Sequence, residues 1–329
     1  MKFKTTVVMA GILALLIVAL YWSGVRRDEK KEATEAAGRF FSFSESDIAE
    51  VTITDSDKTI TLQSVPNNPN TPYLITAPIE TVADDGMVSS FFFQLARLKS
   101  ERKIAEHPAD LVPFGLDHPA QSVQIVVKGG KDLIEVGGKS ITGRGIYLKV
   151  GGAVHLVESG ITDYLTKSFD DFRRRELFSF FSSDVQSIQF EGGGESIMLT
   201  QKKGEWMVRR LLPKPEPPIK ADTSKVVPVV SRLSALRGRS FIDENREGRL
   251  TTFGSPFFRV KIVLDMGTQE GAFYKGETGA IYVTTTTPKT PIYEVSSEDL
   301  AVIQQPMAHF VLPEKEQKVG TTRRVAPTD

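Results

Sequence analysis

Two stretches of sequence, ADDGMVSSFFFQLARL at residues 83–98 and ADTSKVVPVVSRLSAL at residues 221–236, decide the fold. Each begins with an Ala-Asp pair and continues with apolar residues at the spacing of one helix face. An aspartate in this place accepts a hydrogen bond from the free backbone N–H groups of a first helical turn. The stretches therefore predict two equivalent helices, capped by Asp84 and Asp222, each with one apolar face.

Pro228 interrupts the second of these helices. A proline inside a helix removes one backbone hydrogen bond, and its ring clashes with the preceding turn. We therefore expect the second helix to start late or to kink.

The similarity continues on both sides of the helices at a nearly constant offset. Phe114-Gly115 corresponds to Phe253-Gly254, 139 residues later, and Ile146-Tyr147 corresponds to Ile281-Tyr282, 135 residues later. Further matches are Asp47 with Asp184, Val51 with Ile188, Ile53 with Phe190, and Val123, Ile125 and Val127 with Val260, Ile262 and Leu264. A register kept through strands, helix and turns indicates an internal repeat. We predict two tandem modules, at residues 43–180 and 181–312.

Alternation of apolar and polar residues predicts strands on both sides of each helix. In the first copy, Val51, Ile53, Ile60 and Leu62 predict two strands around a turn at Asp55-Ser56-Asp57, with a third strand near Tyr73–Ile75. About four more strands are expected after each Phe-Gly pair, ending near Val157 and Val295. The predicted fold class is α+β, with a mostly antiparallel sheet and one covering helix in each copy.

The N-terminal region predicts a membrane anchor. Residues 5–22, from Thr5 to Trp22, are uncharged and mostly aliphatic, and eighteen helical residues span about 27 Å of a bilayer core about 30 Å thick. A cleaved signal peptide is the alternative, but Leu20-Tyr21-Trp22 stands where small residues are needed before a cleavage site. The chain has no cysteine, which excludes a lipoprotein acyl anchor. We expect an uncleaved transmembrane helix behind a basic end at residues 1–4.

The charge pattern leaves the orientation of this anchor open. Lys2 and Lys4 precede the span and residues 26–31 contain four basic side chains, so a basic-residue count alone places the body in the cytoplasm. Large domains, however, translocate largely regardless of charge. We therefore expect the body outside the cytoplasm, behind a charged stalk or linker at residues 23–42 and ahead of a disordered tail at residues 313–329.

The overall charge excludes one class of partner. The chain has 41 basic and 41 acidic residues, so residues 23–329, without Lys2 and Lys4, have 39 basic and 41 acidic residues and a net charge of −2. A nucleic-acid-binding protein shows a basic excess. No nucleic-acid partner is therefore predicted.

Candidate chemical sites in the sequence are weak. Gly137-Gly138-Lys139-Ser140 has part of a phosphate-binding loop, but Leu133 occupies the place of its first glycine, so a hairpin turn is expected instead. The four histidines, at positions 107, 118, 155 and 309, lack a second ligand at metal-binding spacing. There is no Gly-x-Ser-x-Gly elbow and no cysteine nucleophile. We predict no catalytic, metal or cofactor-binding residues, and no enzymatic activity.

Two further segments have a structural and a functional interpretation. Asp170-Asp171 and Arg173-Arg174-Arg175 are expected to form local ion pairs at the joint between the copies, with a docking patch as the alternative. The four prolines within residues 213–218 predict a stiff, extended loop that leads to Asp222, with a partner's docking strip as the alternative.

The sequence resembles the bacterial DUF4340 family over roughly residues 72–310, in both copies. The motifs that carry the resemblance are Pro78, Ala83-Asp84, Phe114-Gly115-Leu116-Asp117-His118-Pro119, Val136-Gly137, Gly145-Ile146-Tyr147 and Phe172-Arg173-Arg174-Arg175-Glu176-Leu177. The second copy departs from this pattern, because Ser255 and Pro256 replace the Leu-Asp-x-Pro stretch. A binding role of that turn would then not be duplicated.

The resemblance implies a membrane-anchored accessory component, often encoded beside ABC-type transporters and gliding-associated auxiliary subunits, with no established activity. We therefore expect a non-catalytic scaffold on the periplasmic side of the bacterial inner membrane, with transporter or auxiliary subunits as protein partners. The alternative is a periplasmic ligand-binding module that holds a small molecule or glycan between the copies and delivers it to a transporter.

Overall fold

The computed structural model describes residues 38–313, except 57, 69–70, 142, 244–245 and 287–289. The anchor predicted at residues 5–22, most of the predicted stalk and the tail beyond Pro313 lie outside the described residues. In the described part of the chain, no helix has both the length and the apolar character needed to cross a bilayer.

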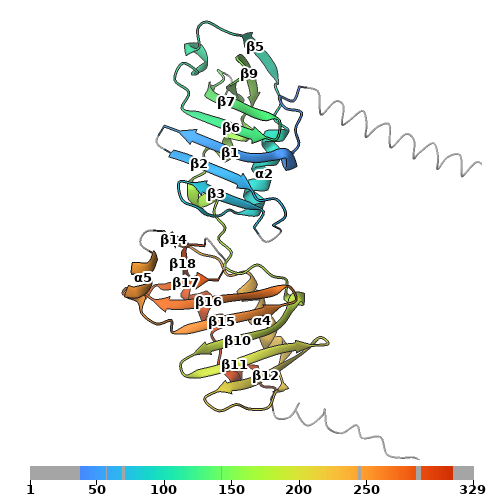
Figure 1. Ribbon diagram of the computed structural model, residues 1–329, viewed down its shortest axis with the longest axis vertical. Coiled ribbons are helices and arrows are strands. Elements are labelled where there is room, and N and C mark those ends of the chain that lie inside the picture. Colours follow the sequence, from blue (N-terminus) through green and yellow to red (C-terminus); the bar gives the residue numbers. More distant parts are fainter. Residues whose placement is uncertain are drawn as a thin grey trace, which may run out of the picture. The chain divides into compact units, whose positions relative to one another are not determined.

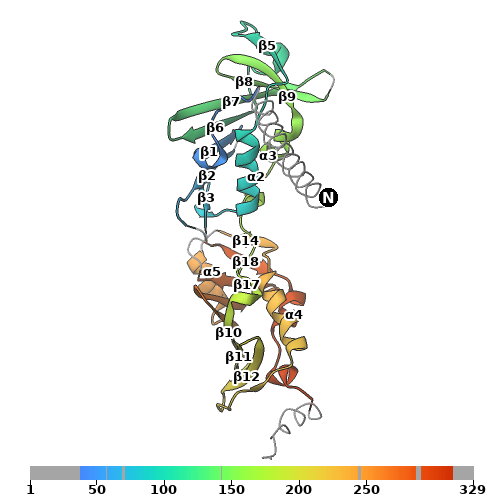
Figure 2. The same cartoon turned by 90° about the vertical axis from the view of Figure 1, so that its right-hand side faces the viewer.

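The chain divides into two compact units, residues 1–79 with 83–172 and residues 80–82 with 173–329. Each unit is built on one of two nine-stranded antiparallel sheets and a few helices, apart from residues 81–82, which form the edge strand of the first sheet but are grouped with the second unit. The predicted α+β fold with two similar modules is confirmed. The ribbon of each unit is shown in two views (Figures 1 and 2).

The sheet of the first unit has the strand order β4-β3-β2-β1-β6-β7-β8-β9-β5. Its strands are β1 (Ile48–Asp55), β2 (Lys58–Ser64), β3 (Tyr73–Ala77), β4 (Thr81–Val82), β5 (Arg102–Glu106), β6 (Gln121–Val127), β7 (Gly130–Lys139), β8 (Gly145–Val150) and β9 (Ala153–Glu158). Its helices are α2 (Asp85–Ala96), α3 (Thr162–Leu165) and the 3-10 helices η1 (Glu45–Asp47), η2 (Val112–Phe114), η3 (Ser159–Ile161) and η4 (Phe169–Asp171).

The sheet of the second unit repeats this order as β13-β12-β11-β10-β15-β16-β17-β18-β14. Its strands are β10 (Val185–Gly192), β11 (Glu195–Lys202), β12 (Glu205–Leu212), β13 (Ile219–Lys220), β14 (Ser240–Ile242), β15 (Phe258–Leu264), β16 (Gly267–Lys275), β17 (Ile281–Thr285) and β18 (Ile292–Val295). Its helices are α4 (Thr223–Ser234), α5 (Arg246–Phe253), α6 (Ser297–Ile303) and the 3-10 helices η5 (Ser182–Asp184) and η6 (Met307–Phe310). The four strands predicted after each Phe-Gly pair are β6–β9 and β15–β18.

The two predicted helix caps are confirmed. Asp84 accepts a hydrogen bond from the Met87 backbone N–H at 2.9 Å, and Asp222 accepts one from the Ser224 N–H at 2.9 Å. Each bond satisfies one of the N–H groups that a helix start leaves without an intrahelical partner.

The expected late start of the second helix is wrong. Helix α4 begins at Thr223, directly after its cap, and contains Pro228. Pro228 is the sixth of the twelve residues of α4, so its missing N–H removes one hydrogen bond in the second turn. The apolar stripe at Val226, Val229 and Leu233 is buried and holds the helix on the sheet.

Matching backbone hydrogen bonds show that the duplication includes the segment before each first strand. The Phe40 N–H donates to the Leu98 carbonyl at 3.0 Å, and the Leu177 N–H donates to the Leu236 carbonyl at 3.1 Å. At the other end of each copy, the N–H of the capping aspartate donates to a phenylalanine carbonyl, Asp84 to Phe172 at 2.7 Å and Asp222 to Phe310 at 2.8 Å.

Each unit has its own hydrophobic core between the sheet and its helix. In the first unit, Val51 and Ile53 of β1 point into a core that also contains Phe91 and Leu95 of α2. Because side chains alternate along a strand, the residues between them point to the opposite face, which is the outer face of the sheet. Helices α2 and α4 each lie against the inner face of the sheet in their own unit (Figure 2).

Candidate functional site

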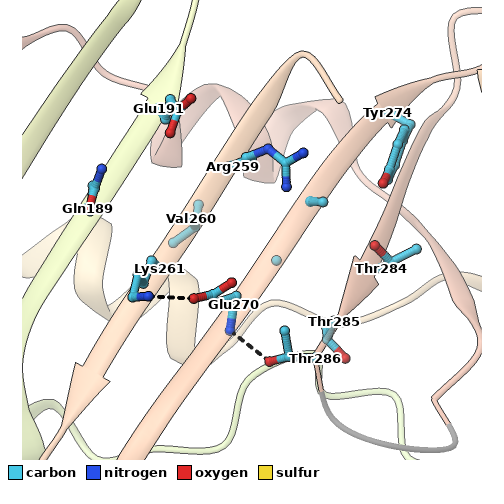
Figure 3. Close-up of a pocket in the computed structure, with 12 residues that line it drawn as sticks. Gln189, Glu191, Arg259, Val260, Lys261, Glu270, Tyr274, Thr284, Thr285 and Thr286 are labelled. Carbon is cyan, nitrogen blue, oxygen red and sulfur yellow. Dashed lines mark hydrogen bonds and ion pairs between the residues drawn. The ribbon is translucent and has the colours of Figure 1, made fainter. Parts of the chain in front are cut away.

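A hollow of about 290 Å³ lies on the outer face of the sheet in the second unit. Its lining comes from β10, β15, β16 and β17, the four central strands (Figure 3). We call it the outer-face hollow. Core residues on one face of these strands fix the opposite face, so the hollow rests on a packed support.

Strand register explains why a hollow forms here. Arg259 of β15 is paired with Ala272 of β16, and Ala272 is paired in turn with Thr284 of β17. The small side chain of Ala272 therefore lies between a long guanidinium side chain and a short hydroxyl side chain. The gap between these neighbours is the floor of the hollow.

The next row of side chains closes one end of the hollow. The Lys261 ammonium forms an ion pair with the Glu270 carboxylate at 2.7 Å, and both side chains are about half exposed. The Glu270 backbone N–H donates to the Thr286 hydroxyl at 3.2 Å, as Figure 3 shows. The charges of this row are therefore neutralised within the protein.

Arg259 differs from Lys261 because no ion pair or hydrogen bond of its guanidinium to the described part of the chain is recorded. Glu191 is its register partner on β10, yet the two side chains diverge in Figure 3. The guanidinium extends toward β16, and the hydroxyl groups of Tyr274 and Thr284 lie on the far side of the same space (Figure 3). The outer-face hollow thus contains a cation and two hydroxyl groups that converge from three strands.

Two long side chains occupy the equivalent place in the first unit. Its β7 and β8 pair Glu135 with Lys149, at the positions of Ala272 and Thr284. The Lys149 ammonium and the Glu135 carboxylate form an ion pair at 2.6 Å. The side chains that border the outer-face hollow in the second copy therefore differ from those at the matching positions of the first.

The Phe-Gly and Ile-Tyr motifs that revealed the repeat contact one another in both units. Phe114 meets Tyr147 edge-on with ring centroids 5.2 Å apart, and Phe253 stacks on Tyr282 at 4.7 Å. Phe253 also lies 6.0 Å from Tyr274, which lines the hollow. The motif therefore fixes a loop on the outer face of each sheet.

The glycines of Gly137-Gly138-Lys139-Ser140 accommodate this loop. They lie in β7 at a register irregularity, and the turn follows only after Lys139, so the hairpin turn expected at these four residues is displaced. A side chain at Gly137 would collide with the Phe114 carbonyl oxygen and the Leu116 side chain. Close approach of the loop thus explains Gly137, as the general use of strand glycines predicts.

The predicted histidine positions do not assemble into a site. Among the described residues, no group of three or more histidine, aspartate or glutamate side chains is placed to hold a metal ion. The His155 Nδ1 lies 2.8 Å from the Ser100 hydroxyl, and Phe40 meets the ring edge-on. Burial, and secondarily the Lys103 charge, lower the pKa of His155.

Comparison with the second copy indicates that the contact between Ser100 and His155 is a packing contact. Tyr293 occupies the equivalent of His155, and Gly238 occupies the equivalent of Ser100. A side chain at Gly238 would meet the Tyr293 ring, whose burial raises the pKa of its hydroxyl to about 12. Both positions therefore serve the core at the edge of the sheet.

Arg173 of the joint segment makes a long-range ion pair in addition to the local pairs that the sequence predicts. Arg173 is 1% exposed, and its guanidinium donates to both carboxylate oxygens of Asp243, at 2.7 and 2.5 Å. Its guanidinium carbon also lies 3.9 Å from the centre of the Phe241 ring. Asp171 caps η4 by accepting from Ser168. This ion pair of Arg173 connects residues far apart in the sequence but within the second unit.

The proline segment forms the loop that leads from β12 to β13. Its Glu216 backbone N–H donates to the Arg210 carbonyl at 3.0 Å, and the Arg210 guanidinium pairs with both Glu195 and Glu216. The segment is held to its own sheet at this point, which favours the stiff-loop interpretation.

Sequence reasoning missed every residue that defines the outer-face hollow. Arg259, Ala272, Tyr274 and Thr284 form no motif, and they are common residue types in strands. One signal could have indicated the hollow: Ala272 and Thr284 replace the charged Glu135 and Lys149 of the first copy. These matches follow from the strand pairing, which the sequence does not show.

The fold and the hollow define a class: an α+β protein with a duplicated nine-stranded sheet module and a polar hollow on one copy. A sequence model of the family described as "Domain of unknown function (DUF4340)" matches residues 74–254, more than half of the chain. The chain therefore belongs to the DUF4340 family, which confirms the resemblance. No curated protein and no solved structure matches the chain.

Proposed function

We propose that this protein is a membrane-anchored accessory or scaffold protein of the bacterial envelope, which acts by contact with subunits of an ABC-type transporter and not by catalysis. The observation that supports this proposal most is the repeated sheet with one packed face and one open face. The open face of each sheet has a cross-strand ion pair, Lys149–Glu135 in the first unit and Lys261–Glu270 in the second. Ordered, flat charge patterns of this kind suit a protein partner, because complementary charges give specificity.

The tether is the second part of this proposal. The apolar run at residues 5–22 is long enough for a bilayer, and tethering raises the effective concentration of a weak partner without new contacts. We place the body on the periplasmic side. A reporter active only after export, fused after Asp329, should be active, whereas activity of a cytoplasmic reporter at that site contradicts this orientation.

Affinity purification from intact membranes after mild crosslinking tests the scaffold role. Charge-swap variants keep each ion pair while reversing its pattern: Glu135→Lys with Lys149→Glu, or Lys261→Glu with Glu270→Lys. At least one swap should reduce recovery of a transporter subunit. The matched control swaps the edge pair of Glu205 and Lys220, whose side chains are more than half exposed.

Two outcomes contradict the scaffold role. Equal recovery of partners from all three swap variants would show that the open faces are not recognised. Full function of a chain that lacks residues 1–22, at native abundance, would remove the need for the tether.

A ligand-binding module is the second candidate function, and the outer-face hollow favours it. The sequence interpretation placed a ligand between the copies. The hollow instead lies within the second unit alone, so delivery of a ligand would require only that unit to bind it.

A further inference from the structure

We propose that the outer-face hollow binds an acidic sugar, a single pyranose ring with a carboxylate that contacts Arg259. This inference goes beyond the scaffold role and does not depend on it. Nothing in the match to the DUF4340 family assigns a ligand to this position.

The charge of the ligand follows from Arg259. Its guanidinium extends over the hollow and has no recorded ion pair with the described part of the chain (Figure 3). A guanidinium offers two parallel N–H donors that match a carboxylate, and such charge-assisted bonds are stronger than neutral ones. Lys261, the other cation of the lining, is already paired with Glu270. Arg259 is therefore the group that selects an anion.

Glu191 limits the strength of this attraction. It is the register partner of Arg259 on β10 and lines the same hollow, so its carboxylate repels an anionic ligand. Its side chain diverges from Arg259 in Figure 3, which leaves the guanidinium accessible from the β16 side. We therefore expect weak binding that improves when this negative charge is removed.

The remaining lining selects a hydroxylated ligand. Tyr274 and Thr284 present hydroxyl groups toward the hollow, and Gln189 adds an amide whose nitrogen donates to the Ser196 hydroxyl at 3.1 Å. Val260 also borders the hollow, but its side chain is buried in the core, so Ala272 is the aliphatic side chain that faces the hollow. An apolar ligand would desolvate these polar groups without replacing their hydrogen bonds, which is costly. A sugar ring offers hydroxyl groups to them, and the Tyr274 ring adds an aromatic surface.

The size of the hollow limits the ligand to one ring. Its volume of about 290 Å³ lies at the lower end of the range for small-molecule sites, about 300–1,000 Å³.

Binding of glucuronate to the full chain in mild detergent tests this inference, with glucose as the uncharged match. Isothermal titration or ligand-observed NMR should detect glucuronate and not glucose. Arg259→Gln should weaken binding about tenfold, as expected for the loss of one charge-assisted contact. Arg209→Gln is the matched control, because Arg209 lies on β12 of the same sheet and should leave binding unchanged.

Two more variants test the space in the hollow and the charge of Glu191. The double variant Ala272→Glu with Thr284→Lys recreates the Glu135–Lys149 pair, which the same fold accommodates in the first unit, and should abolish binding. Circular dichroism verifies that this variant is folded. Glu191→Gln should tighten binding.

Several results would overturn the inference. Equal binding of glucose and glucuronate would remove the role of the carboxylate, and equal losses in the two arginine variants would remove the specific role of Arg259. Binding of a short acidic peptide in place of glucuronate would replace the sugar as ligand. Failure of the scaffold proposal is a separate result: it would appear as equal partner recovery from the charge-swap variants. The titrations described here do not measure partner recovery.

Discussion

Replacing Asp243 with alanine tests how strongly the joint segment is held to the second unit. Arg173 is 1% exposed, whereas the Asp243 side chain is 21% exposed. Breaking a buried ion pair by removing one partner costs about 3–5 kcal/mol, because the remaining charge stays buried. Water reaches the Asp243 side of this pair, so we expect the lower end, about 3 kcal/mol, for Asp243→Ala. For a unit of this size, that corresponds to a fall in Tm of roughly 10 °C.

Tryptophan fluorescence during urea unfolding measures this loss. The chain has two tryptophans, Trp22 and Trp206, and Trp206 is buried in β12 of the second unit. In a Trp22→Phe background, the signal reports unfolding of the second unit alone. Glu205→Ala is the control, because its exposed pair with Lys220 should contribute less than about 1 kcal/mol.

A double variant separates the ion pair from packing. Arg173→Met with Asp243→Leu removes both charges, and replacement of a buried pair by apolar residues is often close to neutral. The double variant should therefore be more stable than Asp243→Ala. The reasoning is refuted if Asp243→Ala loses no more stability than Glu205→Ala, or if the double variant is the least stable of the three.

Three further perturbations test other parts of the structure. Asp222→Ala should cost about 1 kcal/mol in the fluorescence assay through loss of the helix cap, whereas Asp222→Asn should retain most of it. Gly137→Ala should lower the Tm measured by circular dichroism, at a cost of about 1–3 kcal/mol, because the new methyl group meets the Phe114 carbonyl. Gly138→Ala, which makes only an ordinary contact with the same oxygen, should change little. Burial holds the pKa of His155 below its ordinary value of 6.5, so on acidification the unfolded state binds a proton first. The stability of the first unit should therefore be retained above about pH 6.5 and fall below it, and His155→Leu should reduce that fall in urea unfolding at pH 7.5 and pH 5.

The sequence by itself determined the duplication, the helix caps and the main strands. These features depend on local chemistry: Asp84 and Asp222 satisfy the first turn of their own helices, and the alternation at Val51 and Ile53 is the period of a strand. The duplication was visible because the same local signals recur in the same order.

Local signals were less reliable where tertiary packing outweighs them. Pro228 predicted a helix that starts late or kinks, and the late start is wrong: helix α4 begins at Thr223, where its cap and its buried stripe stabilise the first turns. The ion pair of Arg173 with Asp243, 70 residues away along the chain, has no signal in the sequence around Arg173.

Only the tertiary structure decided the outer-face hollow. Its residues come from four strands, and no short-range pattern links Arg259 with Thr284. Strand register places Ala272 between them, where the first unit has Glu135. The hollow exists because a small side chain stands beside long ones across a sheet, and neighbours across a sheet are set by pairing and not by sequence distance.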